Sequence, residues 1–307
     1  MNACASLRTL VAPFLMVLAL LGSPLQPAHA GSAPDVVVRL TVVAGQDIQF
    51  TALTGEAGLP SGNVYGIAQD TQGFLWFATG DGLSRYDGYS LRTFRFDRDN
   101  ANSLAHNTVD SILMGHNGVL WLGTTGGGVD RFDPVTETFT HHRHNPSSPT
   151  SLSSNSISRK GLLEDPQGVL WVGTNDSGLN RIDLLTGAVT YFRHDPKNAN
   201  SLSSNNLESI YQDSERTLWI GTADAGLNRL DPVTGRITRY ASHPEDPHTL
   251  PNPRVHAVYE DRAGRFWVLT NGGLASLDRR TGRFTRYAIA TGRADRDVSA
   301  DLRGALI

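Results

Sequence analysis

The stretch Leu170-Trp171-Val172-Gly173-Thr174 recurs five times in nearly the same form, and the five copies hold all five tryptophans of the chain. The other copies are Leu75-Trp76-Phe77-Ala78-Thr79, Leu120-Trp121-Leu122-Gly123-Thr124, Leu218-Trp219-Ile220-Gly221-Thr222 and Phe266-Trp267-Val268-Leu269-Thr270. The tryptophans follow one another at steps of 45, 50, 48 and 48 residues. A period near this length is typical of propellers and solenoids built from one repeated unit. It predicts a repeat architecture and favours a binding role over catalysis.

Each unit contains four short runs rich in β-branched and aromatic residues, separated by turn signals. In the fourth unit these runs are Leu207 to Gln212, Leu218 to Thr222, Leu227 to Leu230 and Arg236 to Tyr240. Such runs favour strands. We therefore expect an all-β fold, a β-propeller of four-stranded blades, with about five blades present plus the start of a sixth.

The tryptophan strand is apolar on both faces. Trp76 and Ala78 point one way, and Leu75 and Phe77 point the other way. A strand that is apolar on both faces must be covered on both. We therefore predict that the tryptophans form the core between neighbouring blades.

Aspartates recur at two turns of the unit, as in Asp70 to Gly73 and Asp231 to Gly235. Aspartate side chains hydrogen-bond the backbone of their own turn, so we interpret them as turn formers and not as metal ligands. Two departures are visible. The second unit has Gly115 in place of the first-turn aspartate, and the third unit is two residues longer before Asp165.

The pattern Asp-x-x-Gly-x-Leu-Trp-hydrophobic-Gly-Thr-x-x-Gly-Leu-x-Arg-hydrophobic-Asp resembles the two-component regulator propeller repeat, from about Gln49 to the C-terminus. The resemblance implies a seven-bladed propeller in the periplasmic sensor portion of a bacterial signalling protein. Such proteins continue into a further β-domain, a membrane helix and a histidine kinase or diguanylate cyclase. The resemblance also implies carbohydrate fragments as one class of ligand.

The first 30 residues have the pattern of a secretory signal peptide, with Arg8, an apolar run and an Ala28-His29-Ala30 cleavage signature. Cleavage after Ala30 removes Cys4, the only cysteine, so we expect an exported, periplasmic protein without disulfides. The predicted organisation follows in residue numbers: signal peptide 1–30, linker or strand 31–48, repeats 49–307, with units near 63–96, 107–142, 155–192, 205–240 and 253–287 and a partial unit 298–307. Because the last residues align with the start of a blade, we expect an N-terminal fragment that forms an open arc of poor solubility.

The net charge of −3 gives no indication of a nucleic-acid partner. We expect contact with a membrane only through parts beyond this chain, and the full receptor could form a homodimer. No nucleophile elbow, phosphate-binding loop or metalloprotease motif is present, so we expect neither catalysis nor a cofactor.

Ligands of a propeller would meet the loops around its axis, which join strands two and three or lead into strand one. Polar residues vary at equivalent places in the first of these loops, on a constant scaffold. They are the candidate ligand-binding residues: Asp81, Thr125, Asn175, Asp176, Asp224 and Asn271. The alternative is that they are ordinary exposed loop residues.

Two further clusters have competing interpretations. The histidines His141, His142 and His144 could hold zinc or copper, but His194 and His243 recur at matching places, which favours a role in the connection between blades, and we expect no metal. The last units are rich in arginine, which could form an anion-binding surface, although a solvated face is the simpler interpretation. These arginines are Arg254, Arg262, Arg265, Arg279, Arg280, Arg283 and Arg286.

Three functions are open at this point. The first is a periplasmic sensor module that binds a small molecule or an oligosaccharide. The second is an exported propeller enzyme, such as a polysaccharide lyase or hydrolase, because a fold does not decide function. The third is a plain protein-interaction scaffold. Paired acids or a cluster of histidine, tyrosine and arginine at the axis would favour the enzyme.

Overall fold

The structure is a computed structural model that describes residues 58–287. This part of the chain folds into five four-stranded blades. The strands are, in blade 1, β1 (Val64–Gln69), β2 (Leu75–Thr79), β3 (Gly82–Tyr86) and β4 (Leu91–Phe94); in blade 2, β5 (Val109–Met114), β6 (Leu120–Thr124), β7 (Gly128–Asp133) and β8 (Thr138–His142); in blade 3, β9 (Ile157–Glu164), β10 (Val169–Thr174), β11 (Leu179–Asp183) and β12 (Val189–Phe192); in blade 4, β13 (Leu207–Gln212), β14 (Leu218–Thr222), β15 (Leu227–Leu230) and β16 (Ile237–Tyr240); and in blade 5, β17 (Val255–Glu260), β18 (Phe266–Thr270), β19 (Gly273–Asp278) and β20 (Arg283–Tyr287).

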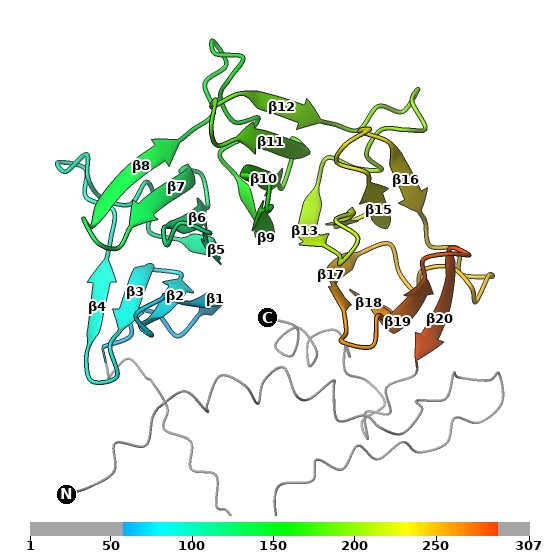
Figure 1. The fold of residues 1–307 in the computed structure, drawn as a ribbon, viewed down its shortest axis with the longest axis horizontal. Helices are drawn as coiled ribbons and strands as arrows, with labels where there is room; N and C mark the ends of the chain where they lie inside the picture. The colour runs from blue at the N-terminus through cyan, green and yellow to red at the C-terminus, as the bar shows by residue number, and fades with distance from the viewer. Residues whose placement is uncertain (1–57, 288–307) are drawn as a thin grey trace, which may run out of the picture.

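Within each blade the four strands pair antiparallel in chain order. The blades fan around a common centre, with β1, β5, β9, β13 and β17 innermost (Figure 1). A parallel bridge between Lys160 and Ser209 also joins the innermost strands of blades 3 and 4. The expected all-β propeller of four-stranded blades is therefore confirmed.

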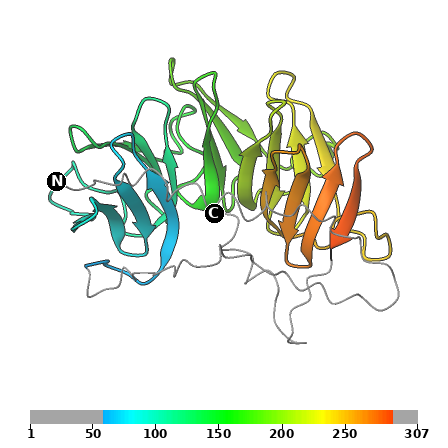
Figure 2. The same cartoon turned by 60° about the horizontal axis from the view of Figure 1, so that its bottom comes forward.

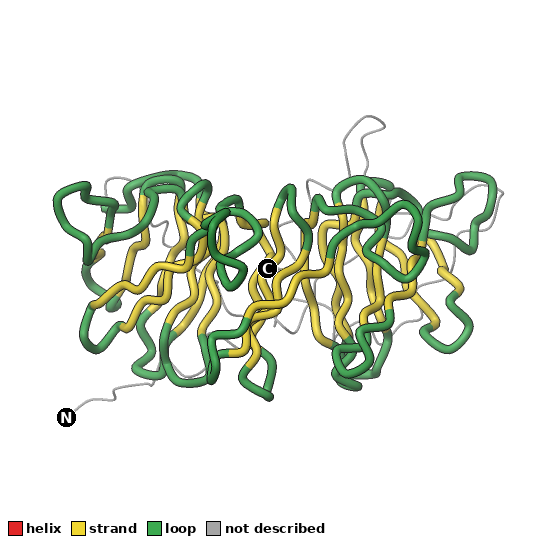
Figure 3. Tube along the Cα trace, turned by 90° about the horizontal axis from the view of Figure 1, so that it is seen from above, coloured by secondary structure: helices red, strands yellow, loops and turns green. Residues whose placement is uncertain are grey.

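The views from the side show strands and loops only, with the turns gathered at the two rims of the array (Figures 2 and 3). Residues 58–287 contain no helix that is long and apolar enough to cross a lipid bilayer. The predicted signal peptide, the linker 31–48 and the partial unit 298–307 lie outside the described residues.

Four of the five tryptophans lie between neighbouring blades, as the repeat predicts, and the ring of Trp267 lies 5.3 Å from that of Tyr287 in its own blade. All five side chains are at most 3% exposed. Trp76 of blade 1 packs against Phe132 of blade 2, with ring centroids 5.4 Å apart, and Trp219 of blade 4 packs against Phe266 of blade 5 at 4.5 Å. Each core cluster accordingly combines the tryptophan face of one blade with the opposite face of the next.

The glycine after the tryptophan allows the next blade to approach closely. A Cβ atom added at Gly123 would lie 2.7 Å from Ile157, and one added at Gly221 would lie 2.7 Å from the carbonyl oxygen of Val255. Both partners are the first residues of the neighbouring innermost strand. The absence of a side chain at these positions therefore sets how close the innermost strands come to one another.

The first-turn aspartate has two roles. One carboxylate oxygen of Asp213 accepts hydrogen bonds from backbone amides of its own turn, and the other accepts from Nε1 of Trp219 at 2.8 Å. The same indole contact recurs in blades 1, 3 and 5. In blade 2, where Gly115 replaces the aspartate, Trp121 Nε1 donates instead to Glu164 of blade 3 at 3.0 Å. The interpretation as turn formers holds, and the indole contact adds a second reason for the aspartate.

Candidate ligand-binding site at the centre of the blades

The centre of the array contains a pocket of about 520 Å³ to which all five blades contribute. Its walls come mainly from the innermost strands and are polar. The lining residues are Val64, Tyr65, Asp110, Ile157, Arg159, Lys160, Asn175, Glu208, Arg254 and His256.

One position of the repeat supplies most of the polar lining. The second residue of the innermost strand is Tyr65 in blade 1, Asp110 in blade 2, Glu208 in blade 4 and His256 in blade 5. In each case the strand pairing is irregular at this residue, as in a β-bulge. A bulge leaves one residue out of the ladder and redirects its side chain. The scaffold is therefore constant, while the group presented to the pocket differs from blade to blade.

Blade 3 departs from this plan because its innermost strand is longer. Ile157 and Leu162 of β9 pair with Thr174 and Val172, whereas the equivalent pairs in blade 4 enclose only Glu208 and Ser209. The two extra residues of the third repeat thus lie in the innermost strand. Their insertion brings both Arg159 and Lys160 to the pocket.

Glu208 is the electrostatic centre of one wall. It accepts hydrogen bonds from Arg254, at 2.8 Å from Nε and 2.6 Å from a terminal nitrogen, and lies 3.5 Å from Nδ1 of His256. Burial alone would raise the pKa of the Glu208 carboxyl, but the hydrogen bonds from His256 and Arg254 outweigh it and lower the pKa. The Glu208 carboxylate is therefore ionised and already neutralised by protein groups.

Two lining residues of blade 3, Arg159 and Lys160, carry basic side chains. The guanidinium of Arg159 lies 4.7 Å from the centre of the Tyr65 ring, a cation–π contact between blades 3 and 1. Arg159 is exposed and has no carboxylate partner among residues 58–287. The pKa of Lys160 is lowered by burial, an effect that the charge of Glu208 only partly offsets.

The predicted loop residues fall into three groups. Asn175 lines the pocket. Thr125 and Asn271 do not line the pocket but contact residues that do. The Thr125 hydroxyl contacts Asp110, and Asn271 Oδ1 lies 2.5 Å from His256 Nε2. Asp81 pairs with Arg95 at 3.2 Å, and Asp176 and Asp224 are exposed outside the pocket lining.

The bulge residues and the two-residue insertion of blade 3 were not predicted as site residues. A signal for them exists in the aligned repeats. The position after Val64, Val109, Leu207 and Val255 changes from tyrosine to aspartate, glutamate and histidine, although its neighbours stay apolar or small. Because the position lies inside a strand, its variation indicates function more strongly than variation in a loop does.

The three clustered histidines have separate structural partners. His141 pairs with the buried Asp130 at 2.7 Å, the His142 ring packs 5.8 Å from that of Trp121, and His144 Nδ1 lies 2.6 Å from the carbonyl oxygen of Leu152. His194 repeats the last contact with Leu202 at 2.7 Å. In the described part of the chain no group of three potential metal ligands converges.

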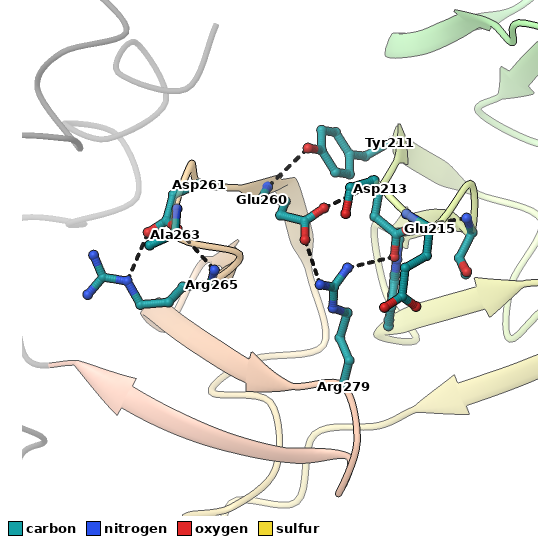
Figure 4. Close-up of polar contacts among 11 residues, drawn as sticks. Tyr211, Asp213, Glu215, Glu260, Asp261, Ala263, Arg265 and Arg279 are labelled. Atoms are coloured by element: carbon teal, nitrogen blue, oxygen red, sulfur yellow. Dashed lines mark hydrogen bonds and ion pairs between the residues drawn. The ribbon is translucent and has the colours of Figure 1, made fainter.

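Several of the clustered arginines are not part of a solvated face. Arg254 lies in the pocket, and Arg279 bridges blades 4 and 5 by binding Asp213 at 2.9 Å and Glu260 at 2.5 Å (Figure 4). Arg286 donates to several backbone carbonyl groups, including that of Leu250. For Arg279 and Arg286 the interpretation as a solvated face is wrong, because protein acceptors bind their guanidinium groups, whereas the Arg254 side chain binds Glu208 and is still 44% exposed.

Four-stranded blades stacked radially through buried tryptophans define a β-propeller protein. The model of the two-component regulator propeller matches the chain five times, at residues 58–81, 103–126, 151–176, 201–224 and 249–272. Residues 58–272 therefore carry five two-component regulator propeller repeats. No curated protein matches it in sequence.

Solved structures with the same fold include two extracellular domains from B. thetaiotaomicron. That of BT3049, described as a hybrid two-component system, is 27% identical over 77% of this chain and 32% of its own length, with a TM-score of 0.68. That of BT4673 is 22% identical over 80% of this chain and 34% of its own length, with a TM-score of 0.64. Virginiamycin B lyase from Staphylococcus aureus shares the fold at 18% identity and a TM-score of 0.55, over 76% of this chain and 73% of its own. The chain spans about a third of the length of the two extracellular domains.

Proposed function

We propose that this chain is the periplasmic ligand-sensing module of a two-component or cyclic-di-GMP signalling receptor, and that its ligand is a carbohydrate bound in the axial pocket. The observation that supports this most strongly is the pocket itself, since blades 1, 2, 4 and 5 each present a different side chain at one redirected position of an otherwise constant strand, and blade 3 adds two residues there. The signal-peptide pattern of residues 1–30 supports export.

The composition of the pocket suits a sugar. Tyr65 offers an aromatic face, and Asn175, Asp110 and Glu208 offer donors and acceptors for hydroxyl groups. Signalling through such a site requires that the ligand bind two states of the whole receptor with different affinity. Because all five blades line the pocket, a bound ligand would contact groups that move whenever the blades shift against one another.

Calorimetric titration of the chain with oligosaccharide fragments of plant and microbial polysaccharides tests this proposal. We expect a fragment to bind and Asn175→Ala to weaken its binding about tenfold, as loss of a hydrogen bond implies. Asp224→Ala, at an exposed position outside the pocket, is the matched control and should bind normally. If the control weakens binding and Asn175→Ala does not, the site lies in the outer loops instead.

A polysaccharide lyase or hydrolase is the second candidate, because Tyr65, Arg159 and His256 line one pocket together with the acids Asp110 and Glu208. One observation weighs against it. Both ring nitrogens of His256 already face protein groups, Glu208 and Asn271, so neither is available to take a proton from a substrate. Release of new reducing ends or unsaturated sugars from a polysaccharide incubated with the chain would favour the enzyme.

A further inference from the structure

We infer that blade 4 carries a second binding site, separate from the axial pocket, which holds a sulfate or phosphate group between Arg216, Arg229 and Arg236. The site lies at the rim of the array opposite to the loops that join strands two and three, because successive turns of an antiparallel blade alternate between its two ends. The inference goes beyond the proposed function and does not depend on it.

The site is a pocket of about 520 Å³ that blade 4 alone lines. Its three arginines come from three different elements. Arg216 lies in the turn before β14, Arg229 lies in β15, and Arg236 lies at the end of the hairpin before β16. Two threonines and two acids share the lining: Thr217, Thr238, Glu215 and Asp231. Guanidinium groups bind phosphate oxygens through paired hydrogen bonds, so three of them on separate elements suit a tetrahedral anion.

Arg216 has a backbone conformation that the repeat otherwise gives to glycine. Its φ is 64°, in the left-handed region that a residue with a side chain disfavours. The matching turn residue of each other blade is a glycine of positive φ: Gly73, Gly118, Gly168 and Gly264. The arginine therefore costs the fold stability that a glycine would keep, and such strain is typical of positions where the side chain has a function.

Contacts within the chain do not account for this strain. The other non-glycine residue of positive φ among residues 58–287 is Glu137, whose carboxylate binds Arg92 of blade 1 at 2.5 and 2.6 Å. The hydrogen bonds of Arg216 use its backbone alone. Neither its guanidinium nor that of Arg236 has an ion pair or a hydrogen bond within the part of the chain that the structure describes. Both side chains are exposed, so a ligand can reach them.

The lining has one more arginine than it has acids. The Asp231 carboxylate serves its own hairpin, because Oδ1 accepts hydrogen bonds from two backbone amides of the turn at 2.9 and 3.1 Å. Hydrogen bonds from Thr234, together with the charge of Arg229, lower the pKa of Asp231, so it is ionised and balances part of the Arg229 charge. Glu215 is exposed and forms no ion pair with the described residues. An anion bound by the other two arginines would balance the remaining charge.

None of the other four described blades repeats this arrangement. Three of them keep the arginine of the third strand: Arg85, Arg131 and Arg181. At the place of Arg236 the same three blades have Ser90, Thr138 and Ala188. Blade 5 has Arg283 there, but Ser276 takes the place of Arg229. The scaffold therefore does not need the three arginines together, and their combination in blade 4 is better explained by a ligand.

Calorimetric titration of the chain with inorganic sulfate and inorganic phosphate tests the inference, with sodium chloride of equal ionic strength as the reference. We expect both oxyanions to bind and to raise the melting temperature more than chloride does. Glucose 6-sulfate, glucose 6-phosphate, glucose and phosphatidylglycerol vesicles then identify the source of the group. Tighter binding of the sugar esters would assign the site to an esterified sugar, binding of the vesicles would assign it to a lipid headgroup, and tighter binding of the inorganic ions would assign it to the free anion.

Two variants locate the binding, and the first separates it from folding. Arg216→Gly gives this turn the residue of the other blades, so it should raise the melting temperature by about 2–4 °C while it weakens anion binding about tenfold. Arg236→Ser, with the residue of blade 1, should also weaken binding about tenfold. The matched control is Arg283→Ser, at the same place in blade 5, which should bind like the wild type.

The inference is overturned if sulfate and phosphate act no more strongly than chloride, or if Arg216→Gly and Arg236→Ser keep the wild-type affinity. It is overturned as well if Arg283→Ser lowers the affinity as much as they do. Asn175→Ala, in the axial pocket, should leave oxyanion binding unchanged, and a loss in this variant would place the anion in the axial pocket instead. Because the two sites have separate variants, failure of this site leaves the proposed sensor function standing.

Discussion

Trp121 shows how one residue outside a blade can replace a missing turn residue within it. In four blades the indole donates to an aspartate six positions earlier, but blade 2 has Gly115 at the matching turn. Glu164 of blade 3 supplies the acceptor at 3.0 Å, and a Cβ atom at Gly115 would lie 2.6 Å from its carboxylate. The glycine and the glutamate are thus a matched pair across two blades.

Replacing Glu164 should therefore destabilise the contact between blades 2 and 3. Glu164→Ala leaves Trp121 Nε1 without its acceptor, and we expect the free energy of unfolding to fall by about 1–3 kcal/mol. Gly115→Asp should also destabilise the wild type, because it places a second carboxylate beside the first. In the Glu164→Ala background, Gly115→Asp should lower the free energy of unfolding by less than it does in the wild type. Chemical denaturation of the wild type, the two single variants and the double variant gives the coupling energy between the two positions. Additive effects on the free energy of unfolding would contradict the pairing.

A second residue-scale prediction concerns the stability that Lys160 removes. The unfolded chain has the ordinary lysine pKa of 10.5, and burial lowers the pKa in the fold. The unfolded state therefore binds more protons between these two values, so stability rises with pH in this window. We expect Lys160→Met to stabilise the chain by about 0.5–2 kcal/mol at neutral pH.

This gain should shrink as the pH rises through the folded-state pKa, because the wild-type lysine then loses its charge. Denaturation curves of both proteins from pH 7 to 10 provide the measurement. The control is Lys197→Met, at an exposed loop position, which should leave stability unchanged at every pH. A gain that does not depend on pH would point to better packing and away from charge.

At the scale of elements, the blades are joined by packing in four interfaces and by a further ionic bridge between blades 4 and 5. Arg279, at the end of β19, reaches Asp213 of blade 4 and Glu260 of its own blade, and its side chain is 19% exposed (Figure 4). Burial would raise the pKa of Glu260, but hydrogen bonds from Ser214 and Arg279 lower it overall. The bridge therefore links two turns through ionised groups.

Arg279→Met should cost about 2–3 kcal/mol at neutral pH, because it leaves two carboxylates facing each other without their shared cation. A lowered carboxyl pKa stabilises the fold above the unfolded value of 4.5, and this stabilisation is lost as the pH falls through the folded-state pKa. The difference between variant and wild type should thus narrow in acid. Arg280→Met, one residue away and exposed, is the control for urea denaturation at pH 7 and pH 4. If the difference in the free energy of unfolding between Arg279→Met and the wild type grows at pH 4, an ionic role of Arg279 is excluded.

The strands and turns could be predicted from the sequence because the pattern of each one occurs in five copies. The tryptophan strand, the hairpin turns and the burial of the indoles follow from local pattern and from the need to cover two apolar faces. The location of the insertion did not follow, since the spacing shows only that two residues are added before Asp165. Pairing with β10 was needed to place them in the innermost strand.

At the scale of the whole molecule, the site depends on residues that no single repeat contains. Tyr65 and Arg159 are 94 positions apart in the chain, yet their contact spans the axis from blade 1 to blade 3. Of the predicted loop residues only Asn175 reaches the pocket lining, because the innermost strands lie closer to the axis than the loops do. Each repeat by itself encodes its own blade, whereas the pocket forms only when residues of several blades come together.

The assembled pocket also predicts how binding depends on pH if the carbohydrate is an acidic sugar such as a uronate. The groups that share the pocket with Lys160 come from every other blade: Glu208, Asp110, Arg254, His256 and Tyr65, together with Arg159 of its own strand. Glu208, with its lowered pKa, stays ionised from neutral to alkaline pH, so its charge is constant in this range. Burial lowers the pKa of Lys160, so its charge change falls at a lower pH than that of an ordinary lysine.

Affinity for a uronate should therefore be complete below the pKa of Lys160 and fall as the pH rises through it, because only the charged ammonium attracts the carboxylate. The bound carboxylate raises that pKa, so binding takes up protons in this window, and calorimetry in buffers of different ionisation enthalpy measures the uptake. Lys160→Arg keeps the positive charge at all accessible pH values and should bind without this pH dependence, while the methyl ester should show none with either protein. An affinity that stays constant through the pH range in which Lys160 of the wild type loses its charge would exclude Lys160 as a ligand-binding cation and leave Arg159 to act alone.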